Sequence, residues 1–129
     1  QLKRIGPKAP IVIYFHYSIT GPYSQWWSVR EKRAFRKVIR GHNVIAIFHG
    51  HFHASYHYRW EGLDVYNVGS PLYNYPTFAV VKVTATHLVV NNWNYERERW
   101  DWHHTKRLRI GPDPKLLPRR RRPPRRTAP

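Results

Sequence analysis

Two short apolar runs, separated by an amphipathic segment, constrain the fold of this chain more than any other feature of its sequence. Residues 11–16 (IVIYFH) and 44–48 (VIAIF) are rich in β-branched and aromatic residues, which is the pattern of strands buried on both faces. Between them, Ser28 and Glu31 have the spacing of a capping box, and apolar residues then recur at helical spacing, which predicts a helix over residues 29–40. A strand, a helix and a strand in this order predict a β-α-β unit with two parallel strands.

The segments that follow have the pattern of antiparallel strands. Residues 56–60 and 63–68 flank a Glu-Gly pair and predict a hairpin, and residues 78–84 and 88–93 predict a second one. The predicted fold class is therefore α/β, with a β-α-β unit followed by an antiparallel meander.

The character of the sequence changes after about residue 94. Residues 95–117 are polar, and we expect them to form an irregular C-terminal extension of the folded part, residues 1–94. Residues 118–129 (PRRRRPPRRTAP) contain no acid and too few apolar side chains to form a core. We expect this Arg/Pro-rich tail to be disordered.

Composition limits the classes of site and partner. The 129 residues contain neither Met nor Cys and begin with Gln, so we expect a piece of a longer translation product. Without Cys, a metal ion would be held by imidazole, carboxylate, amide or water. No apolar run approaches the roughly 20 residues needed to span a bilayer, so no membrane span is expected. The formal charge of +16 keeps nucleic acid open as a partner without favouring it, because the tail contributes much of the charge.

Four of the nine histidines gather at the ends of the two predicted parallel strands. His16 closes the first apolar run, and His49, His51 and His53 alternate just after the second, around Gly50. Because the carboxyl ends of parallel strands meet at one edge of a sheet, we expect imidazoles from both runs to converge there. Gly50 is expected to allow the sharp turn that presents His51 and His53 together with His16.

An apolar strand ending in His, a helix, and an apolar strand running into Gly-His-x-His resembles the C-terminal half of the calcineurin-like metallophosphoesterases. Residues 67–71 (NVGSP) resemble a pattern of the same family, and the resemblance covers about residues 10–94. It implies the C-terminal half of an αββα sandwich, in which helices cover two mixed β-sheets. The missing N-terminal half of the same domain is then an expected partner.

The resemblance also implies a chemistry. It implies that His16 and His51 bind one ion of a binuclear centre, that His53 binds the other, and that His49 supports a neighbouring ligand. Two divalent ions, Mn, Fe or Zn, would hold a bridging hydroxide that attacks the phosphorus of a phosphomonoester or phosphodiester. The acidic motifs of the family, of the forms Gly-Asp-x-His, Gly-Asp-x-x-Asp and Gly-Asn-His-Glu, do not occur here. We therefore expect hydrolase activity in the full-length protein, no general acid in this chain, and little or no turnover by this chain alone.

Substrate contacts and two other functions complete the expectations. Tyr17, Tyr23 and Trp27 follow the first strand, and with Arg59 they are candidates to contact a phosphate ester, although the alternative for the aromatic residues is packing within the loop. Trp, Tyr and Arg are mixed between residues 93 and 109, which suits a basic nucleic-acid-binding module. The other alternative is a non-catalytic remnant of the phosphoesterase fold, since the acidic motifs do not occur.

Overall fold

The structure, a computed structural model, describes residues 2–21, 23–73 and 76–109. The Arg/Pro-rich tail, residues 118–129, lies outside these described residues, so its expected disorder stays a prediction. Within the described part, the chain forms, in order, η1 (Leu2–Arg4), β1 (Pro10–Phe15), η2 (Ser24–Trp26), α1 (Val29–Ile39), β2 (Asn43–His49), β3 (Ser55–Trp60), β4 (Leu63–Val68), β5 (Thr77–Val83), β6 (His87–Asn94) and β7 (Arg99–Arg107).

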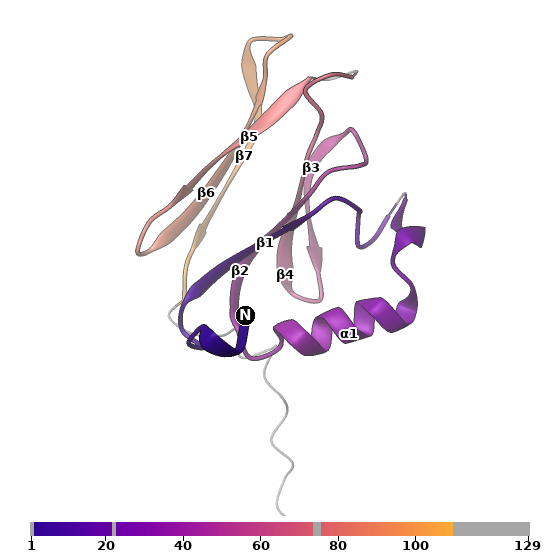
Figure 1. Cartoon of the computed structure of the whole chain (residues 1–129). Helices are drawn as coiled ribbons and strands as arrows, with labels where there is room; N and C mark the ends of the chain where they lie inside the picture. The colour runs from indigo at the N-terminus through magenta and orange to yellow at the C-terminus, as the bar shows by residue number, and fades with distance from the viewer. Residues whose placement is uncertain (1, 22, 74–75, 110–129) are drawn as a thin grey trace, which may run out of the picture.

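The first sheet has four strands in the order β1-β2-β4-β3 (Figure 1). Strand β2 pairs in parallel with β1 on one side and with β4 on the other, while β3 and β4 form an antiparallel hairpin. The predicted β-α-β unit and the predicted hairpin are therefore both present. The carboxyl ends of β1, β2 and β4 lie at the same edge of this sheet.

Helix α1 begins where the sequence pattern predicts. The Ser28 hydroxyl accepts a hydrogen bond from the backbone N–H of Glu31 at 3.2 Å, and the Glu31 carboxylate accepts one from the backbone N–H of Ser28 at 2.8 Å. This capping box satisfies two donors that would otherwise be unpaired at the helix start. Within the described residues, no helix is long and apolar enough to cross a membrane.

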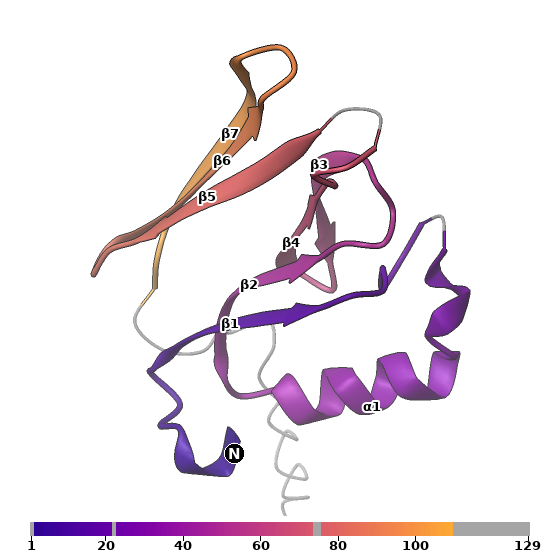
Figure 2. The same ribbon diagram turned by 45° about the horizontal axis from the view of Figure 1, so that its top comes forward.

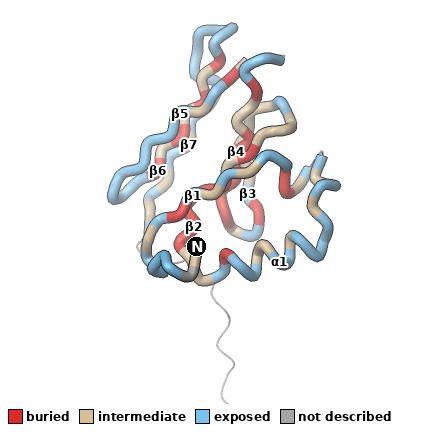
Figure 3. The backbone as a smooth tube through the Cα atoms, in the orientation of Figure 1, coloured by how far each residue is buried: buried red, intermediate tan, exposed pale blue. Residues whose placement is uncertain are grey.

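Two apolar clusters lie on the two faces of the first sheet. Val65 of β4 belongs to a cluster that includes Ile39 of α1, with Phe35 packed against it. The next residue, Tyr66, points to the other face, into a cluster that includes Leu88 of β6. Figures 1 and 2 show α1 on one side of the four-stranded sheet and the second sheet on the other. Burial is accordingly concentrated along β2 and β4 (Figure 3).

The second sheet has three antiparallel strands in the order β5-β6-β7. The predicted hairpin of β5 and β6 is present. The irregular conformation expected after residue 94 is wrong for Arg99–Arg107, because these residues form β7 and pair along β6. Most side chains of β7 are polar, so the sequence lacks the apolar run that predicts the other strands. The division of the chain into three parts stays a prediction.

The expectation that the first apolar run is a strand buried on both faces is wrong. Strand β1 is at the edge of the described sheet, and Tyr14 is 83% exposed, whereas β2 is buried along almost its whole length. A run of apolar residues indicates a strand but does not decide how many neighbours the strand has.

The predicted fold class is confirmed. The chain is an α/β protein in which two sheets face each other and a β-α-β unit is followed by antiparallel strands, an arrangement consistent with a metallophosphoesterase-type sandwich. Among the described residues, the α-helical cover is α1 alone, on the outer side of the first sheet.

Candidate metal-binding site

His16 and His51 lie side by side at the carboxyl edge of the first sheet. His16 directly follows β1, and His51 lies two residues beyond the end of β2. A backbone hydrogen bond from the Gly50 N–H to the His16 carbonyl, 3.2 Å long, joins the two connections. The imidazole Nε2 of His16 is 3.1 Å from Nδ1 of His51. The convergence of these two histidines is thus present in the structure, while their role as ligands stays a prediction.

The distance between the two nitrogens fits a shared metal ion. Two imidazole nitrogens that each lie about 2.1 Å from one ion are about 3.0–3.4 Å apart for bond angles between octahedral and tetrahedral. The observed 3.1 Å falls in this interval. The same two atoms could otherwise share one proton in a hydrogen bond, so binding an ion at this position requires both imidazoles to be neutral and to present lone pairs.

His51 has an unusual backbone conformation for a residue that is not glycine. Its φ angle is +64°, whereas Gly50 is not among the residues with positive φ, so the turn expected at Gly50 occurs at His51. Three aromatic rings surround the imidazole: Tyr17, Tyr23 and Trp26 have ring centroids 4.8, 5.4 and 6.2 Å from that of His51. This packing holds the ring in place over a backbone that costs free energy to adopt.

His53, expected to bind a second ion, does not join the pair. Its ring is exposed and stacks on Tyr73, with centroids 4.3 Å apart and planes 7° apart. His51 and His53 nevertheless line one open cleft of about 1520 Å³, together with Tyr23 and Glu96. Glu96 was not singled out from the sequence, because it lies in the stretch expected to be irregular. It is a carboxylate that shares the cleft with the histidines.

His49 makes contacts that suit a supporting residue. It is 2% exposed, its Nδ1 donates a hydrogen bond to the Gly50 carbonyl at 3.0 Å, and its Nε2 is 2.9 Å from the Tyr58 hydroxyl. Because a carbonyl can only accept, Nδ1 must bear the proton and Nε2 accepts from Tyr58. Burial lowers the pKa of His49 and raises the pKa of Tyr58 to about 12, so both groups are neutral near pH 7.

The structure separates the four residues considered for substrate contacts. Tyr17 and Tyr23 lie against His51, as described above. Trp27 packs on Phe15 and Phe35, with ring centroids 5.3 and 5.4 Å away, and its indole N–H donates to the Tyr17 carbonyl. Arg59 lies in a different cavity, beside Asp64. Two of the four therefore lie near the histidine pair.

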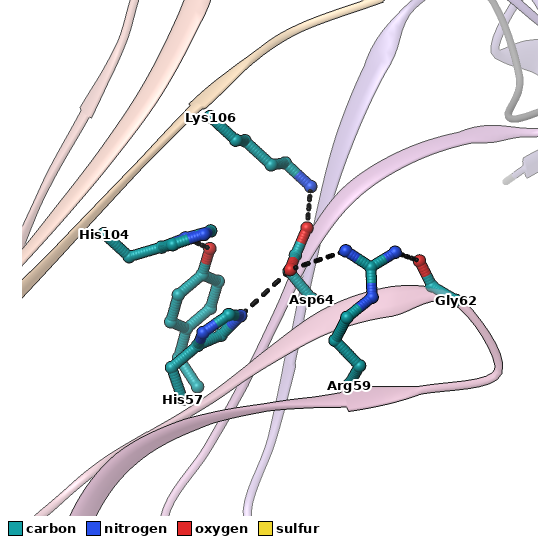
Figure 4. A network of polar contacts seen from close by, with 7 residues as sticks. His57, Arg59, Gly62, Asp64, His104 and Lys106 are labelled. Atoms are coloured by element: carbon teal, nitrogen blue, oxygen red, sulfur yellow. Dashed lines mark hydrogen bonds and ion pairs between the residues drawn. The ribbon is translucent and has the colours of Figure 1, made fainter.

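A second polar cluster, not expected from the sequence, joins the two sheets (Figure 4). His57 of β3 donates from Nε2 to Asp64 of β4 at 2.9 Å, and His104 of β7 stacks on His57 with ring centroids 4.1 Å apart. The Tyr66 hydroxyl lies 2.7 Å from Nδ1 of His104. Lys106, two residues beyond His104, donates to the second oxygen of Asp64 at 2.5 Å. The members of the cluster come from β3, β4 and β7, so strand pairing and sheet packing, rather than a local sequence pattern, bring them together.

This cluster has the ligand types of a metal site, but cationic side chains already occupy its carboxylate. Ligand atoms of His57, Asp64 and His104 all lie within 4.8 Å of one another, the only such group of three among the described residues. However, Asp64 is 4% exposed and already accepts from His57, Arg59 and Lys106. A metal ion here would have to displace two cationic side chains from the carboxylate.

Comparisons with known proteins give a partial likeness in fold. No family model and no curated protein matches the sequence. Two solved structures of Vps29 from Entamoeba histolytica are similar: a single mutant, 15% identical with a TM-score of 0.44 over 73% of this chain and 53% of that chain, and a double mutant, 15% identical with a TM-score of 0.40 over 66% and 49%. The chain therefore spans about half the length of these structures. The likeness assigns no family and no activity.

Proposed function

We propose that this chain provides the imidazole ligands of a metal-dependent phosphoesterase that hydrolyses phosphomonoesters or phosphodiesters. The observation that supports the proposal is the 3.1 Å separation of His16 Nε2 and His51 Nδ1 at the carboxyl edge of a parallel sheet, next to an open cleft. The metal would be Mn, Fe or Zn, since imidazole and carboxylate sites accept all three. In this proposal His53 becomes a ligand of a second ion by leaving Tyr73.

The roles of the chain's own residues follow from their contacts. His16 and His51 would hold the ion, and the aromatic rings of Tyr17, Tyr23 and Trp26 keep the His51 imidazole directed towards His16. A bound ion would supply Lewis-acid activation of water and of the phosphoryl oxygens. Tyr17 and Tyr23 would also form one wall of the substrate position.

This chain supplies few of the carboxylate ligands that a binuclear metal site needs. Neutral imidazoles cannot balance the charge of two divalent ions, and Glu96 is the one acid that lines the cleft with His51 and His53 among the described residues. We propose that the other half of the domain contributes the bridging and terminal carboxylates. This chain alone would then bind metal weakly, and turnover would require both halves.

Metal binding by the chain tests the proposal directly. Calorimetric titration with Zn²⁺ or Mn²⁺ should give a saturable site that disappears with a chelator. His16→Ala and His51→Gly should each lower the affinity about tenfold or more, because removing a ligand costs at least as much as removing a group that orients one. Glycine is chosen at position 51 because it tolerates the positive φ.

A matched control uses another histidine. His103→Ala removes an exposed imidazole from β7, away from the pair, and should leave metal affinity unchanged. Equal losses in His103→Ala and His51→Gly would mean that metal binds histidines non-specifically, and the proposal would fail. Metal binding by the full-length protein without chelator-sensitive hydrolysis of a phosphate ester would instead support a non-catalytic metal-binding fold.

Nucleic-acid binding is the second candidate, and one exposed basic surface supports it. The exposed face of α1 carries Arg30, Arg33 and Lys37, and Trp26 just before the helix is 56% exposed. Such a surface would bind single strands with an affinity that falls steeply with salt and does not respond to a chelator. Titration of a labelled oligonucleotide at two salt concentrations, with and without chelator, distinguishes it from the metal-dependent function.

A further inference from the structure

A second cavity lies at the opposite end of the sandwich from the His16–His51 pair. Its volume is about 240 Å³, and its walls come from the start of β2, the turn between β3 and β4, and the end of β7. Asn43, at the start of β2, lines it, whereas His49 ends the same strand near the histidine pair. At about 3.3 Å per residue, β2 separates the two sites by about 20 Å. We call this cavity the basic pocket.

The lining of the basic pocket has an excess of positive charge. Four cationic residues, Arg59, Lys106, Arg107 and Arg109, line the pocket together with one acidic residue, Asp64. Three of the four are arginines, whose planar guanidinium groups match the oxygens of phosphate or carboxylate.

Asp64 cannot neutralise this excess, because its oxygens are already shared. One oxygen accepts from His57 at 2.9 Å and from Arg59 at 3.4 Å, and the other accepts from Lys106 at 2.5 Å. These partners hold the pKa of Asp64 below its usual value although burial alone would raise it, so the carboxylate has a single negative charge near pH 7. Arg107 and Arg109 remain exposed at the rim.

The size and the apolar part of the wall favour a small ligand. Val44, Leu63 and Leu108 also line the pocket, and low-dielectric walls strengthen the attraction between an anion and nearby cations. A volume of about 240 Å³ is below the roughly 300–1,000 Å³ of pockets that take drug-sized ligands. This volume is also too small to take up more than a single phosphate-sized group of a nucleic acid.

We propose that the basic pocket binds a small tetrahedral oxyanion, namely a phosphate group, either free or as a phosphomonoester. Arg107 and Arg109 would donate to the anion from the rim and Arg59 from the β3–β4 hairpin, while Lys106 stays on Asp64. The anion would neutralise the positive charge of the pocket that Asp64 does not neutralise. The site is independent of the metal proposed at His16 and His51.

Titration of the whole chain with inorganic phosphate, and separately with glycerol phosphate, tests this proposal. Amide chemical shifts near the pocket should change saturably in the wild-type protein. The double variant Arg107→Gln/Arg109→Gln should weaken binding about tenfold or more, because the loss of one charge-assisted hydrogen bond exceeds the free energy of one tenfold step. Both arginines are exposed, so the variant should fold.

The control removes the same number of charges elsewhere. Arg33→Gln/Lys37→Gln changes the exposed face of α1, which does not line the pocket, and should alter the affinity less than about twofold. Equal weakening in both double variants would show general attraction by net charge and overturn the proposal. So would an absence of saturation, or an oligonucleotide that binds at these residues and is not displaced by phosphate. Phosphate binding that persists in His51→Gly separates this site from the proposed metal centre.

If phosphate and glycerol phosphate bind equally, the free ion suffices. Tighter binding of glycerol phosphate would place the ester group against Val44 and Leu63. A measurement of thermal unfolding supplies an independent readout, since a ligand that binds only the native state raises the midpoint. Phosphate should raise the midpoint of the wild-type and of Arg33→Gln/Lys37→Gln but not that of Arg107→Gln/Arg109→Gln.

Discussion

The hydroxyl of Tyr66 lies 2.7 Å from Nδ1 of His104, so a strand of one sheet is hydrogen-bonded to a strand of the other. Tyr66 is fully buried, and the His104 ring also stacks on His57. Burial, with the nearby His57, lowers the pKa of His104. Burial also raises the pKa of Tyr66 well above its usual range, so this contact joins two neutral groups near pH 7.

This contact predicts that stability falls as pH decreases through the ordinary histidine pKa. His104 and His49 both have lowered pKa values in the folded protein, whereas in the unfolded chain they titrate near 6.5. Below that pH the unfolded chain takes up protons that the folded protein does not, so the free energy of unfolding decreases. Urea unfolding at pH 7.5 and at pH 5.5 should show the decrease.

The replacement His104→Gln tests which group is responsible. It removes one of the two imidazoles whose pKa is lowered in the folded protein and keeps a polar side chain, so the difference in stability between the two pH values should become smaller. Asp64 does not interfere, because its lowered pKa gives stability that is lost only as pH falls below the ordinary value of 3.8. An unchanged difference in His104→Gln would contradict the role given to His104.

The contacts of Asp64 predict which of two substitutions lowers the free energy of unfolding more. Lys106 donates to it at 2.5 Å and its side chain is 24% exposed, whereas Arg59 is 3.4 Å away and 59% exposed. Lys106→Met should therefore lower the free energy of unfolding by about 2 kcal/mol, since a buried carboxylate loses a charged donor. Arg59→Met should cost less than about 1 kcal/mol. Urea unfolding of both variants at pH 7 gives the comparison, and equal losses would contradict it.

Local patterns predicted the elements of this fold well. Ser28 and Glu31 are three residues apart and form their capping box within one turn, so nothing distant is needed to find it. The Glu61–Gly62 turn likewise places Trp60 opposite Leu63 in the predicted hairpin. The meeting of His16 and His51 was predictable because two parallel strands end at one edge.

Which strands pair, and which way some side chains point, could not be predicted from local sequence patterns. Trp102 donates its indole N–H to the Ser55 hydroxyl, and the two residues are 47 positions apart. No local pattern contains that contact, so β7 was expected to be irregular. The direction of His53 depends on its stacking with Tyr73, and the cleft that both residues line forms only when the chain folds. The edge position of β1 likewise depends on which strands pair.

The NVGSP segment predicts a large effect at its glycine. Gly69 has a φ angle of +81°, and a Cβ atom there would lie 1.9 Å from Oγ1 of Thr77. Gly69→Ala should therefore lower the free energy of unfolding by more than about 2 kcal/mol, because strain and a steric clash combine. Gly41, with φ of +85° and nothing within 4 Å of its added Cβ, is the matched control. Gly41→Ala should cost about 1 kcal/mol, and equal losses in denaturant unfolding would contradict the clash.

The backbone of His51 gives the last prediction, which separates stability from metal binding. Alanine and glycine at position 51 both remove the imidazole and its contacts with the surrounding aromatic rings, but only glycine adopts a φ of +64° without steric cost. His51→Gly should therefore be more stable than His51→Ala by about 1 kcal/mol in urea unfolding. Both variants should lose the metal affinity to a similar extent, since neither has a ligand atom at this position. Equal stability of the two variants would mean that the backbone relaxes out of the left-handed region once the histidine is removed, and that His51 holds this conformation through its side-chain contacts.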